Sequence, residues 1–355
     1  MSIIPAPGTS PDVTSTSELA VPNTGHDHSE PLLKRLANFQ SVWILGVLLV
    51  IVAFFAIKAG GKFFSASNFS TISQNVSILA VIGVGMTFVI VTSGIDLSVG
   101  SVLIFSSVIS AKVMMGMGGD NTAVLIVGLL VAVAVGTAWG LLNGFLVAIA
   151  RVPPLIVTLG TLSLALALAQ VITDALDVGV NATTLTDIGQ YDKILGIPAI
   201  SFIALVVVMI GGVCLHRTRF GLYTFAVGSS EEAAKRVGVK TKRHLISIYA
   251  LSGFLAGLGA IMYLSQFGTT SIGGLSLLNL NAISAVVIGG TSIFGGQGSM
   301  FGTVVGLFIP AVLQAGFVII GVSPYWQGAA LGAVLIAAVY VDQTRRAAAQ
   351  RGSKK

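Results

Sequence analysis

The polar side chains inside the apolar segments of this sequence are mostly neutral amides and hydroxyls. Such groups exchange hydrogen bonds with a neutral polyhydroxylated solute without burying a charge. Hydrogen bonding between helices is the alternative for each residue taken alone. As a set they predict a pathway for a polar, uncharged molecule. The candidates for lining it are Asp96, Ser98, Asn143, Thr158, Thr161, Gln266, Asn279 and Asn281.

Asp96 is the one acid in this set, and it allows three interpretations. A carboxylate at membrane depth is costly and suggests a function. However, Asp96 precedes Leu97-Ser98 at the expected start of a helix, where it can accept free backbone N–H groups and oppose the helix dipole. We prefer the structural cap, and contact with a solute or a role in gating stays open.

Catalytic and metal-binding motifs are missing from the sequence. Gly60-Gly61-Lys62 lacks the earlier glycine and the following hydroxyl of a phosphate-binding loop. No H-E-x-x-H pattern occurs, and the four histidines lie in the N-terminal tail or at the edges of one charged loop. The sequence therefore predicts a non-catalytic protein that binds neither a cofactor nor a metal directly.

The charged loop 217–243 is the most distinctive segment. It holds seven of the nineteen Lys and Arg residues. Residues 231–236 favour a short helix, and Gly238 then lets the chain turn away. We expect two small alanines to leave a face that fits a cleft on a soluble protein. The predicted docking residues are Glu231, Glu232, Ala233, Ala234, Lys235, Arg236 and Gly238.

Composition predicts an all-α integral membrane protein. Of the 355 residues, 54% are hydrophobic and only 9% are charged, whereas soluble domains carry about a quarter. Apolar runs long enough to cross about 30 Å of hydrocarbon recur along the chain. We expect about ten transmembrane helices, at 41–59, 71–91, 98–115, 122–150, 155–173, 199–215, 245–267, 279–293, 300–320 and 325–341.

The distribution of cations predicts the orientation. An even number of spans puts both termini on one side. Fifteen of the nineteen Lys and Arg residues then share that side, which the positive-inside rule assigns to the cytoplasm. The net charge of +6 is thus explained by topology, and we expect no nucleic-acid partner.

Three parts of the chain and two interruptions complete the predicted organisation. Residues 1–38 are expected to be a disordered cytoplasmic tail, 39–343 the transmembrane domain and 344–355 a basic cytoplasmic tail. Glycine-rich breaks at 92–101 and 289–299 predict discontinuous helices and hint at an internal duplication. Gly253-x-x-x-Gly257 and Gly302-x-x-x-Gly306 allow close helix contact, within the chain or between subunits.

Four ordered stretches carry a resemblance to a known family. Residues 94–101, which read Gly-Ile-Asp-Leu-Ser-Val-Gly-Ser, resemble the signature of the ribose/xylose/arabinose-type permeases of bacterial ATP-binding-cassette importers. Residues 152–161, 226–239 and 285–292 agree in the same order. The resemblance covers about residues 40 to 342.

The resemblance implies a permease subunit of the bacterial inner membrane that imports a monosaccharide, either a pentose or a hexose, or a related polyol. Its partners would be a second permease subunit, alike or different, a cytoplasmic ATPase that binds ATP and Mg²⁺, and an external sugar-binding protein. Loop 217–243 would hold the coupling helix. Other cargo, such as a nucleoside, a furanone signal or a branched-chain amino acid, stays open, as does a stand-alone ion-coupled carrier.

Two stretches depart from the family pattern. The family usually has two acids where this sequence has Asn279 and Asn281, so the cargo, the gating or the pairing of two permeases could differ. We predict that at least one of these asparagines lines the pathway. Residues 174–191, expected outside, also fit poorly, and we interpret them as a part that identifies the external partner.

Overall fold

The computed structural model describes most of the chain between residues 40 and 340. The described residues are 40–118, 120–180, 182–273 and 278–323, with 326, 328–330, 332, 333, 336 and 340. The predicted disordered tail and the predicted basic tail both lie outside them. The fold below therefore concerns the described residues from 40 onward alone.

Helices make up almost all of the described structure, as expected for an all-α membrane protein. The only strands among the described residues form one short antiparallel hairpin. In chain order the elements are α2 (Gln40–Ala59), the 3₁₀ turn η1 (Gly60–Lys62), α3 (Ala66–Val91), α4 (Val99–Met117), α5 (Thr122–Ala148), α6 (Pro154–Thr173), α7 (Thr183–Gln190), β1 (Lys193–Ile194), β2 (Ile197–Pro198), α8 (Ala199–Arg217), α9 (Arg219–Ser229), α10 (Glu231–Arg236), α11 (Thr241–Phe267), α12 (Leu278–Ile288) and α13 (Met300–Ile319).

Eight described helices are long and apolar enough to cross a membrane, and each matches a predicted span. The predicted span 279–293 is the shorter apolar helix α12, which ends at Ile288. Gly290 follows with a φ of 91°, a left-handed conformation that ends a helix readily. The predicted span 325–341 is described only in part, and its described residues are helical. The total of ten and the side of the termini stay predictions.

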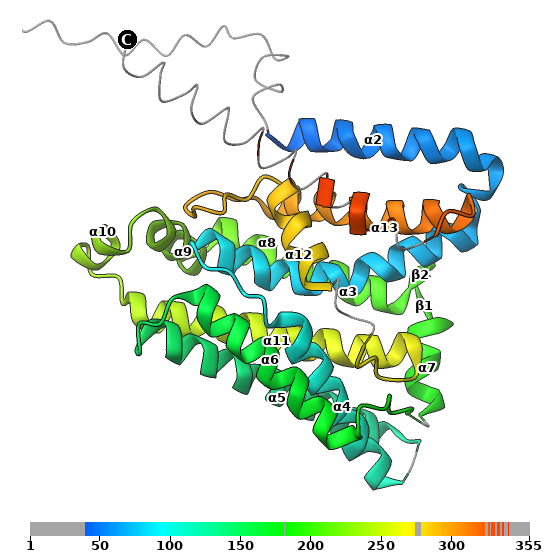
Figure 1. Ribbon diagram of the computed structural model, residues 1–355, viewed down its shortest axis with the longest axis horizontal. Helices are drawn as coiled ribbons and strands as arrows, with labels where there is room; N and C mark the ends of the chain where they lie inside the picture. Colours follow the sequence, from blue (N-terminus) through cyan, green and yellow to red (C-terminus); the bar gives the residue numbers. More distant parts are fainter. Residues whose placement is uncertain are drawn as a thin grey trace, which may run out of the picture. The chain divides into compact units, whose positions relative to one another are not determined.

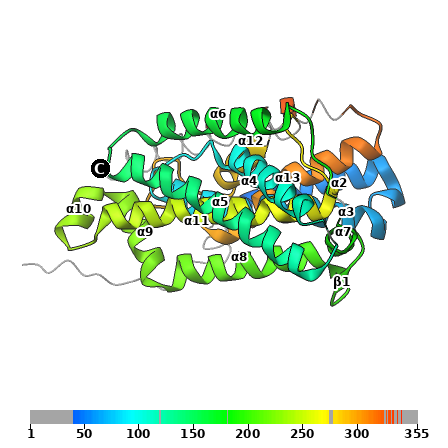
Figure 2. The ribbon, with the colours of Figure 1, turned by 90° about the horizontal axis from the view of Figure 1, so that it is seen from below.

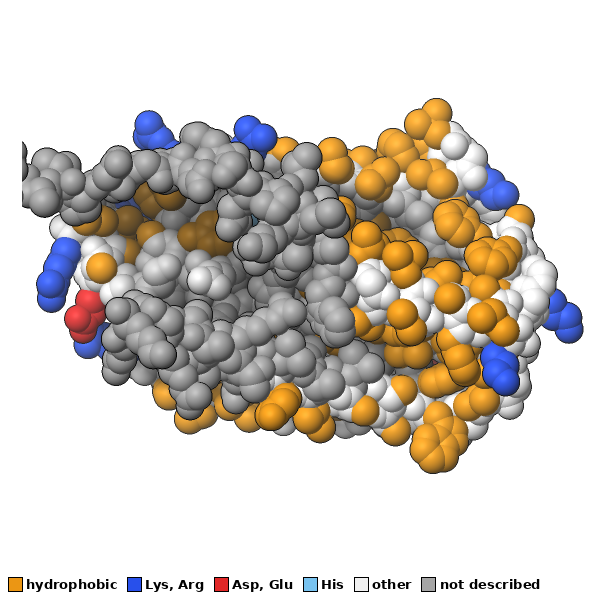
Figure 3. All heavy atoms as spheres, turned by 90° about the horizontal axis from the view of Figure 1, so that it is seen from above, with side chains coloured by type: hydrophobic (Ala, Val, Ile, Leu, Met, Phe, Trp, Pro, Cys, Tyr) orange, Lys and Arg blue, Asp and Glu red, His pale blue; other side chains and the backbone are white. Residues whose placement is uncertain are grey.

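The long helices lie side by side, with α10 at one end of the bundle and α7 with the β1–β2 hairpin at the other (Figures 1 and 2). Helix α3 is the most enclosed of these eight helices, because 89% of its 18-residue apolar stretch is buried inside the protein. It therefore lies at the centre of the bundle. Apolar side chains cover much of the surface toward the α7 end in Figure 3, and the cations lie mainly at the two ends. Such a surface suits a hydrocarbon surrounding.

Helices α5 and α11 touch through their backbones. A Cβ atom added at Gly136 would lie 2.3 Å from the carbonyl oxygen of Gly253, and one at Gly257 would lie 2.3 Å from that of Ala132. Gly302 and Gly306 pack against α12 in the same way. Both predicted small-residue patterns therefore make helix contacts within one chain. The matching glycines of α5, among them Gly136, were not recognised from the sequence.

Candidate functional site

The two glycine-rich breaks predicted from the sequence lie against each other. The first connects α3 to α4, and the second connects α12 to α13. The Gly296 N–H donates to the Val91 carbonyl at 2.9 Å. The Ser93 hydroxyl donates to the Phe294 carbonyl at 2.8 Å. Segments about 200 residues apart thus form one junction. An internal duplication stays a prediction.

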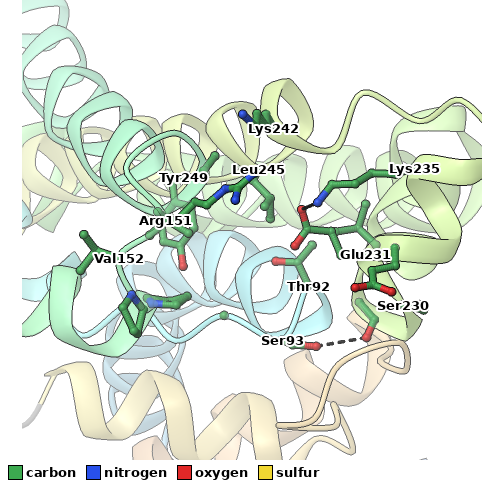
Figure 4. Close-up of a pocket in the computed structure, with 18 residues that line it drawn as sticks. Thr92, Ser93, Arg151, Val152, Ser230, Glu231, Lys235, Lys242, Leu245 and Tyr249 are labelled. Atoms are coloured by element: carbon green, nitrogen blue, oxygen red, sulfur yellow. Dashed lines mark hydrogen bonds and ion pairs between the residues drawn. The ribbon is translucent and has the colours of Figure 1, made fainter.

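The end of α9 joins the same junction through Ser93. The Ser93 hydroxyl also lies within hydrogen-bonding distance of the Gly228 carbonyl, at 3.1 Å (Figure 4). Ser93 has a φ of 63°, a left-handed conformation that non-glycine residues adopt at a cost. A Cβ atom at Gly228 would lie only 1.7 Å from the Val91 carbonyl oxygen, so a glycine is required for this approach. The charged loop therefore rests directly on the first break.

Helix α10 follows at once and is stabilised by local polar contacts. Ser230 starts it, and its hydroxyl accepts the Ala233 N–H at 3.2 Å. Glu231 forms an ion pair of 2.6 Å with Lys235 and accepts the Thr241 hydroxyl at 3.1 Å. The hydrogen bond from Lys235 is the main cause that lowers the pKa of Glu231 below its ordinary value. The predicted short helix 231–236 is confirmed.

The two alanines of α10 do not share one exposed face, contrary to our expectation. Ala233 is exposed, whereas Ala234 is buried. Successive residues of a helix point about 100° apart, so Ala233 can face solvent while Ala234 packs against the protein. Gly238 has a φ of 88° and leads the chain away, as predicted, which leaves the Val237 side chain 79% exposed.

A cavity of about 700 Å³ opens between α10, the first break and the turn that joins α5 to α6. Arg151, from that turn, and Lys235, from α10, extend toward one another across it (Figure 4). The cavity is lined by Thr92, Ser93, Gly94, Val147, Ala148, Arg151, Val152, Pro153, Pro154, Val227, Gly228, Ser230, Glu231, Glu232, Lys235, Lys242, Leu245 and Tyr249.

Behind the cavity lies a buried polar group that we call the Asp96 cluster: Asp96, Ser98, Asn143, Tyr249 and Ser252. Asp96 accepts the Ser98 N–H at 3.0 Å and the Ser98 hydroxyl at 2.6 Å. Ser252 donates to its other oxygen at 2.9 Å. The Asn143 amide in turn donates to the Ser98 hydroxyl at 2.8 Å. Asp96 thus accepts one free backbone N–H, that of Ser98 directly before α4, whereas the Gly100 N–H in the first turn of α4 goes to Asn279. Capping of α4 itself by Asp96, the role that we preferred from the sequence, is not seen.

Two atoms of the Asp96 cluster are buried with no hydrogen-bond partner among the described residues. They are the Tyr249 hydroxyl and the Asn143 carbonyl oxygen. Buried polar atoms are normally satisfied, so such exceptions require an explanation. Tyr249 and Ser252 were not recognised from the sequence, because a single tyrosine or serine inside a long apolar helix gives no local signal.

The other predicted pathway residues do not form one group. Around the start of α4, the Thr158 hydroxyl donates to the Ile95 carbonyl at 3.0 Å, and the Gly100 N–H donates to Asn279 at 2.6 Å. Thr161 bonds within its own helix. The side-chain oxygen of Asn281 is buried without a partner among the described residues. Gln266 lies apart, where it donates to Asn75 at 3.3 Å.

The α7 end is closed by contacts that the sequence did not predict. Helix α7 lies within residues 174–191, where the resemblance was poor, and the β1–β2 hairpin follows directly after it. Ser265 of α11 donates to the Leu185 carbonyl at 2.7 Å, and Gln74 of α3 donates to the Gly189 carbonyl at 3.2 Å. Asp120 accepts the Thr183 hydroxyl and the Thr184 N–H. The bond from Thr183 is the main cause that lowers the pKa of Asp120.

Comparison with known proteins places this architecture in a transport family. Residues 68–339 match the family described as branched-chain amino acid transport system / permease component. The chain is 38% identical to the fructose import permease protein of Rhizobium meliloti, over 89% of this chain and 90% of that one. It is 34% identical to the ribose import permease protein of Escherichia coli K12, over 87% and 97%. The galactose/methyl galactoside import permease protein of Salmonella typhimurium is also 34% identical, over 85% and 93%.

No solved structure is significantly similar to the chain. The family match covers most of the residues, and it includes both breaks, the Asp96 cluster and α10. The three relatives span nearly their whole lengths in the comparison. The chain is therefore a member of this family of transporter permease components.

Proposed function

We propose that this chain is the membrane-spanning subunit of an ATP-binding-cassette importer that carries a monosaccharide, a pentose or a hexose, into the cytoplasm. It is a multi-pass protein of the bacterial inner membrane. Three relatives that cover most of its length are named for the import of fructose, ribose and galactose. The chain itself performs no covalent chemistry, and ATP with Mg²⁺ binds to a partner.

The chemistry around the start of α4 supports a neutral cargo over an amino acid. The family description names branched-chain amino acids, which carry both an ammonium and a carboxylate group. The one buried acid there, Asp96, already accepts three hydrogen bonds from Ser98 and Ser252. The remaining polar groups are amides and hydroxyls, which suit the hydroxyls of a sugar. We therefore assign Asp96, Ser98, Asn143, Thr158 and Asn279 to the pathway.

In this proposal α10 receives the ATPase. Ala233 and Val237 offer small and apolar contacts at the surface, flanked by Glu232, Lys235 and Arg236. The α10 end then faces the cytoplasm, together with both termini. The α7 end faces outward and meets a sugar-binding protein, and a second permease subunit completes the pathway.

The observation that carries the proposal is the contact of Ser93 with Gly228 and Phe294. A movement imposed on α10 can reach both discontinuous helices through this junction. Binding and hydrolysis of ATP by the partner would then shift the permease between outward-open and inward-open states, which differ in affinity for the cargo.

Reconstitution tests the proposed function. The chain is purified together with its candidate ATPase and placed in proteoliposomes with a candidate sugar-binding protein. We expect uptake of labelled ribose, fructose or galactose that requires ATP. Uptake of leucine in place of every sugar would reject the cargo. Uptake driven by an ion gradient without any ATPase would reject the importer.

A further inference from the structure

The unpartnered atoms of the Asp96 cluster are complementary to one hydroxyl group. The Tyr249 hydroxyl can donate a hydrogen bond, and the Asn143 carbonyl oxygen can only accept one. A ligand hydroxyl that accepts from Tyr249 and donates to Asn143 would satisfy both. The Tyr249 side chain is 1% exposed and that of Asn143 is also 1% exposed, so bulk water does not serve as their partner.

Both side chains border the same short loop. Asn143 is tied to it through Ser98 at 2.8 Å. A Cβ atom added at Gly94 would lie 2.7 Å from the Tyr249 hydroxyl oxygen. Tyr249 and Gly94 also line the 700 Å³ cavity, whose volume is in the range of small-molecule sites. The Tyr249 hydroxyl therefore lies against the loop at Gly94, beside a space that can hold a sugar.

We propose that Tyr249 and Asn143 form a subsite that recognises one hydroxyl of the transported sugar at the inner end of the pathway. The inference rests on the proposed function and extends it to a residue that sets specificity within the permease. The cargo reaches the subsite when the loop at Gly94 shifts, and it leaves through the cavity. The neutral amide and phenol select a polyol hydroxyl over a charged group.

The variant Tyr249→Phe separates this role from a structural one. It removes only the hydroxyl, which has no hydrogen-bond partner among the described residues. The folded state therefore loses no hydrogen bond, and the free-energy cost of a buried unsatisfied hydroxyl is removed. We expect its thermal midpoint to stay equal to or above that of the unmodified protein. A residue kept for structure alone would show the reverse.

The decisive measurement is the binding of labelled sugars to the nucleotide-free permease–ATPase complex in nanodiscs. The external binding protein is left out, so that its own selectivity does not contribute. The probes are the transported monosaccharide and its monodeoxy analogues. One analogue is expected to bind about tenfold more weakly than the parent sugar, because it leaves the subsite unpaired. In Tyr249→Phe that ratio is expected to fall to about one.

Tyr263→Phe is the matched control, because Tyr263 lies on the same helix toward the α7 end. It should keep the tenfold ratio. Equal discrimination in Tyr249→Phe and the unmodified complex would overturn the subsite and leave the proposed function intact. A complex that binds none of the monosaccharides would overturn both.

Discussion

The hydroxyl of Ser93 bridges the Gly228 carbonyl, at 3.1 Å, and the Phe294 carbonyl, at 2.8 Å. One side chain thus connects the end of α9 with the second break, while its own backbone belongs to the first. Since α10 begins three residues after Gly228, we expect a displacement of α10 to reach this contact.

Removal of this hydroxyl is expected to weaken coupling more than folding. A hydrogen bond of this kind contributes about 0.5–1.5 kcal/mol, so Ser93→Ala should lower the sugar transported per ATP hydrolysed by about two- to tenfold. Ser247→Ala is the control, because the Ser247 hydroxyl donates to the His244 carbonyl of its own helix. An unchanged ratio of uptake to hydrolysis in Ser93→Ala would contradict the role of Ser93.

A large cation at the exposed position of α10 should block docking of the ATPase. Ala233 is exposed, so Ala233→Arg adds bulk and charge without disturbing the core. We expect loss of ATPase co-purification, with normal insertion into the membrane. Ala66→Arg is the matched control, because it places the same change at an exposed position at the start of α3, toward the α7 end. Retention of the ATPase by Ala233→Arg would reject α10 as the docking element.

The ion pair of Glu231 predicts a pH dependence confined to α10. The pKa of Glu231 is lowered in the folded protein, mainly by the hydrogen bond from Lys235. The contact therefore stabilises α10 above the ordinary pKa of a glutamate and is lost as the pH falls through the lowered value. Both side chains are nearly half exposed, so the contribution is below about 1 kcal/mol.

Hydrogen exchange of residues 231–239 measures this effect. Exchange should accelerate as the pH falls below about 4.3, the ordinary pKa of a glutamate, after correction for the intrinsic rate. Glu231→Gln should exchange faster at neutral pH and lose the pH response. Glu232→Gln serves as the comparison on the neighbouring residue. The prediction fails if the two variants respond alike.

Alanine substitutions of glycine should have opposite effects at two sites. A Cβ atom at Gly253 would lie 2.1 Å from the Gly136 carbonyl oxygen, so Gly253→Ala forces α5 and α11 apart. We expect a loss of about 1–3 kcal/mol, seen as a lower midpoint of thermal unfolding in detergent. At Gly160 of α6 nothing lies within 4 Å, and alanine there should be neutral or stabilising. Equal midpoints for the two variants would contradict the backbone contact.

The helices could be predicted because their signal is local. A run of apolar residues identifies a span without knowledge of its neighbours, and α5, α6, α8 and α13 begin within one residue of the predicted positions. The short helix at residues 231–236 could also be predicted, because helix-forming residues precede a glycine. Residues 183–198 were not, because α7 is held by Asp120, Gln74 and Ser265, which are distant in sequence.

The candidate site could be predicted only in part for the same reason. Asp96 and Ser98 stand out as polar residues beside a glycine-rich break. Ser252, which donates to Asp96, is 156 residues away from it, and Tyr249, which borders the same loop at Gly94, lies on the same distant helix, whose sequence marks neither of them. The inward direction of Ala234 depends on how α10 rests on α9 and α11, which no local pattern encodes. Tertiary contacts, rather than periodicity, assemble this site.

The glycine contact between α5 and α11 also limits which parts of the protein can move. Side chains that interlock can change rotamer and allow two helices to slide, but Gly136 and Gly253 offer no rotamers to change. Sliding would drive one peptide group into another at a separation already near the van der Waals limit. We therefore expect α5 and α11 to move together as one rigid body. The conformational change between the outward-open and inward-open states must then occur in the two glycine-rich breaks.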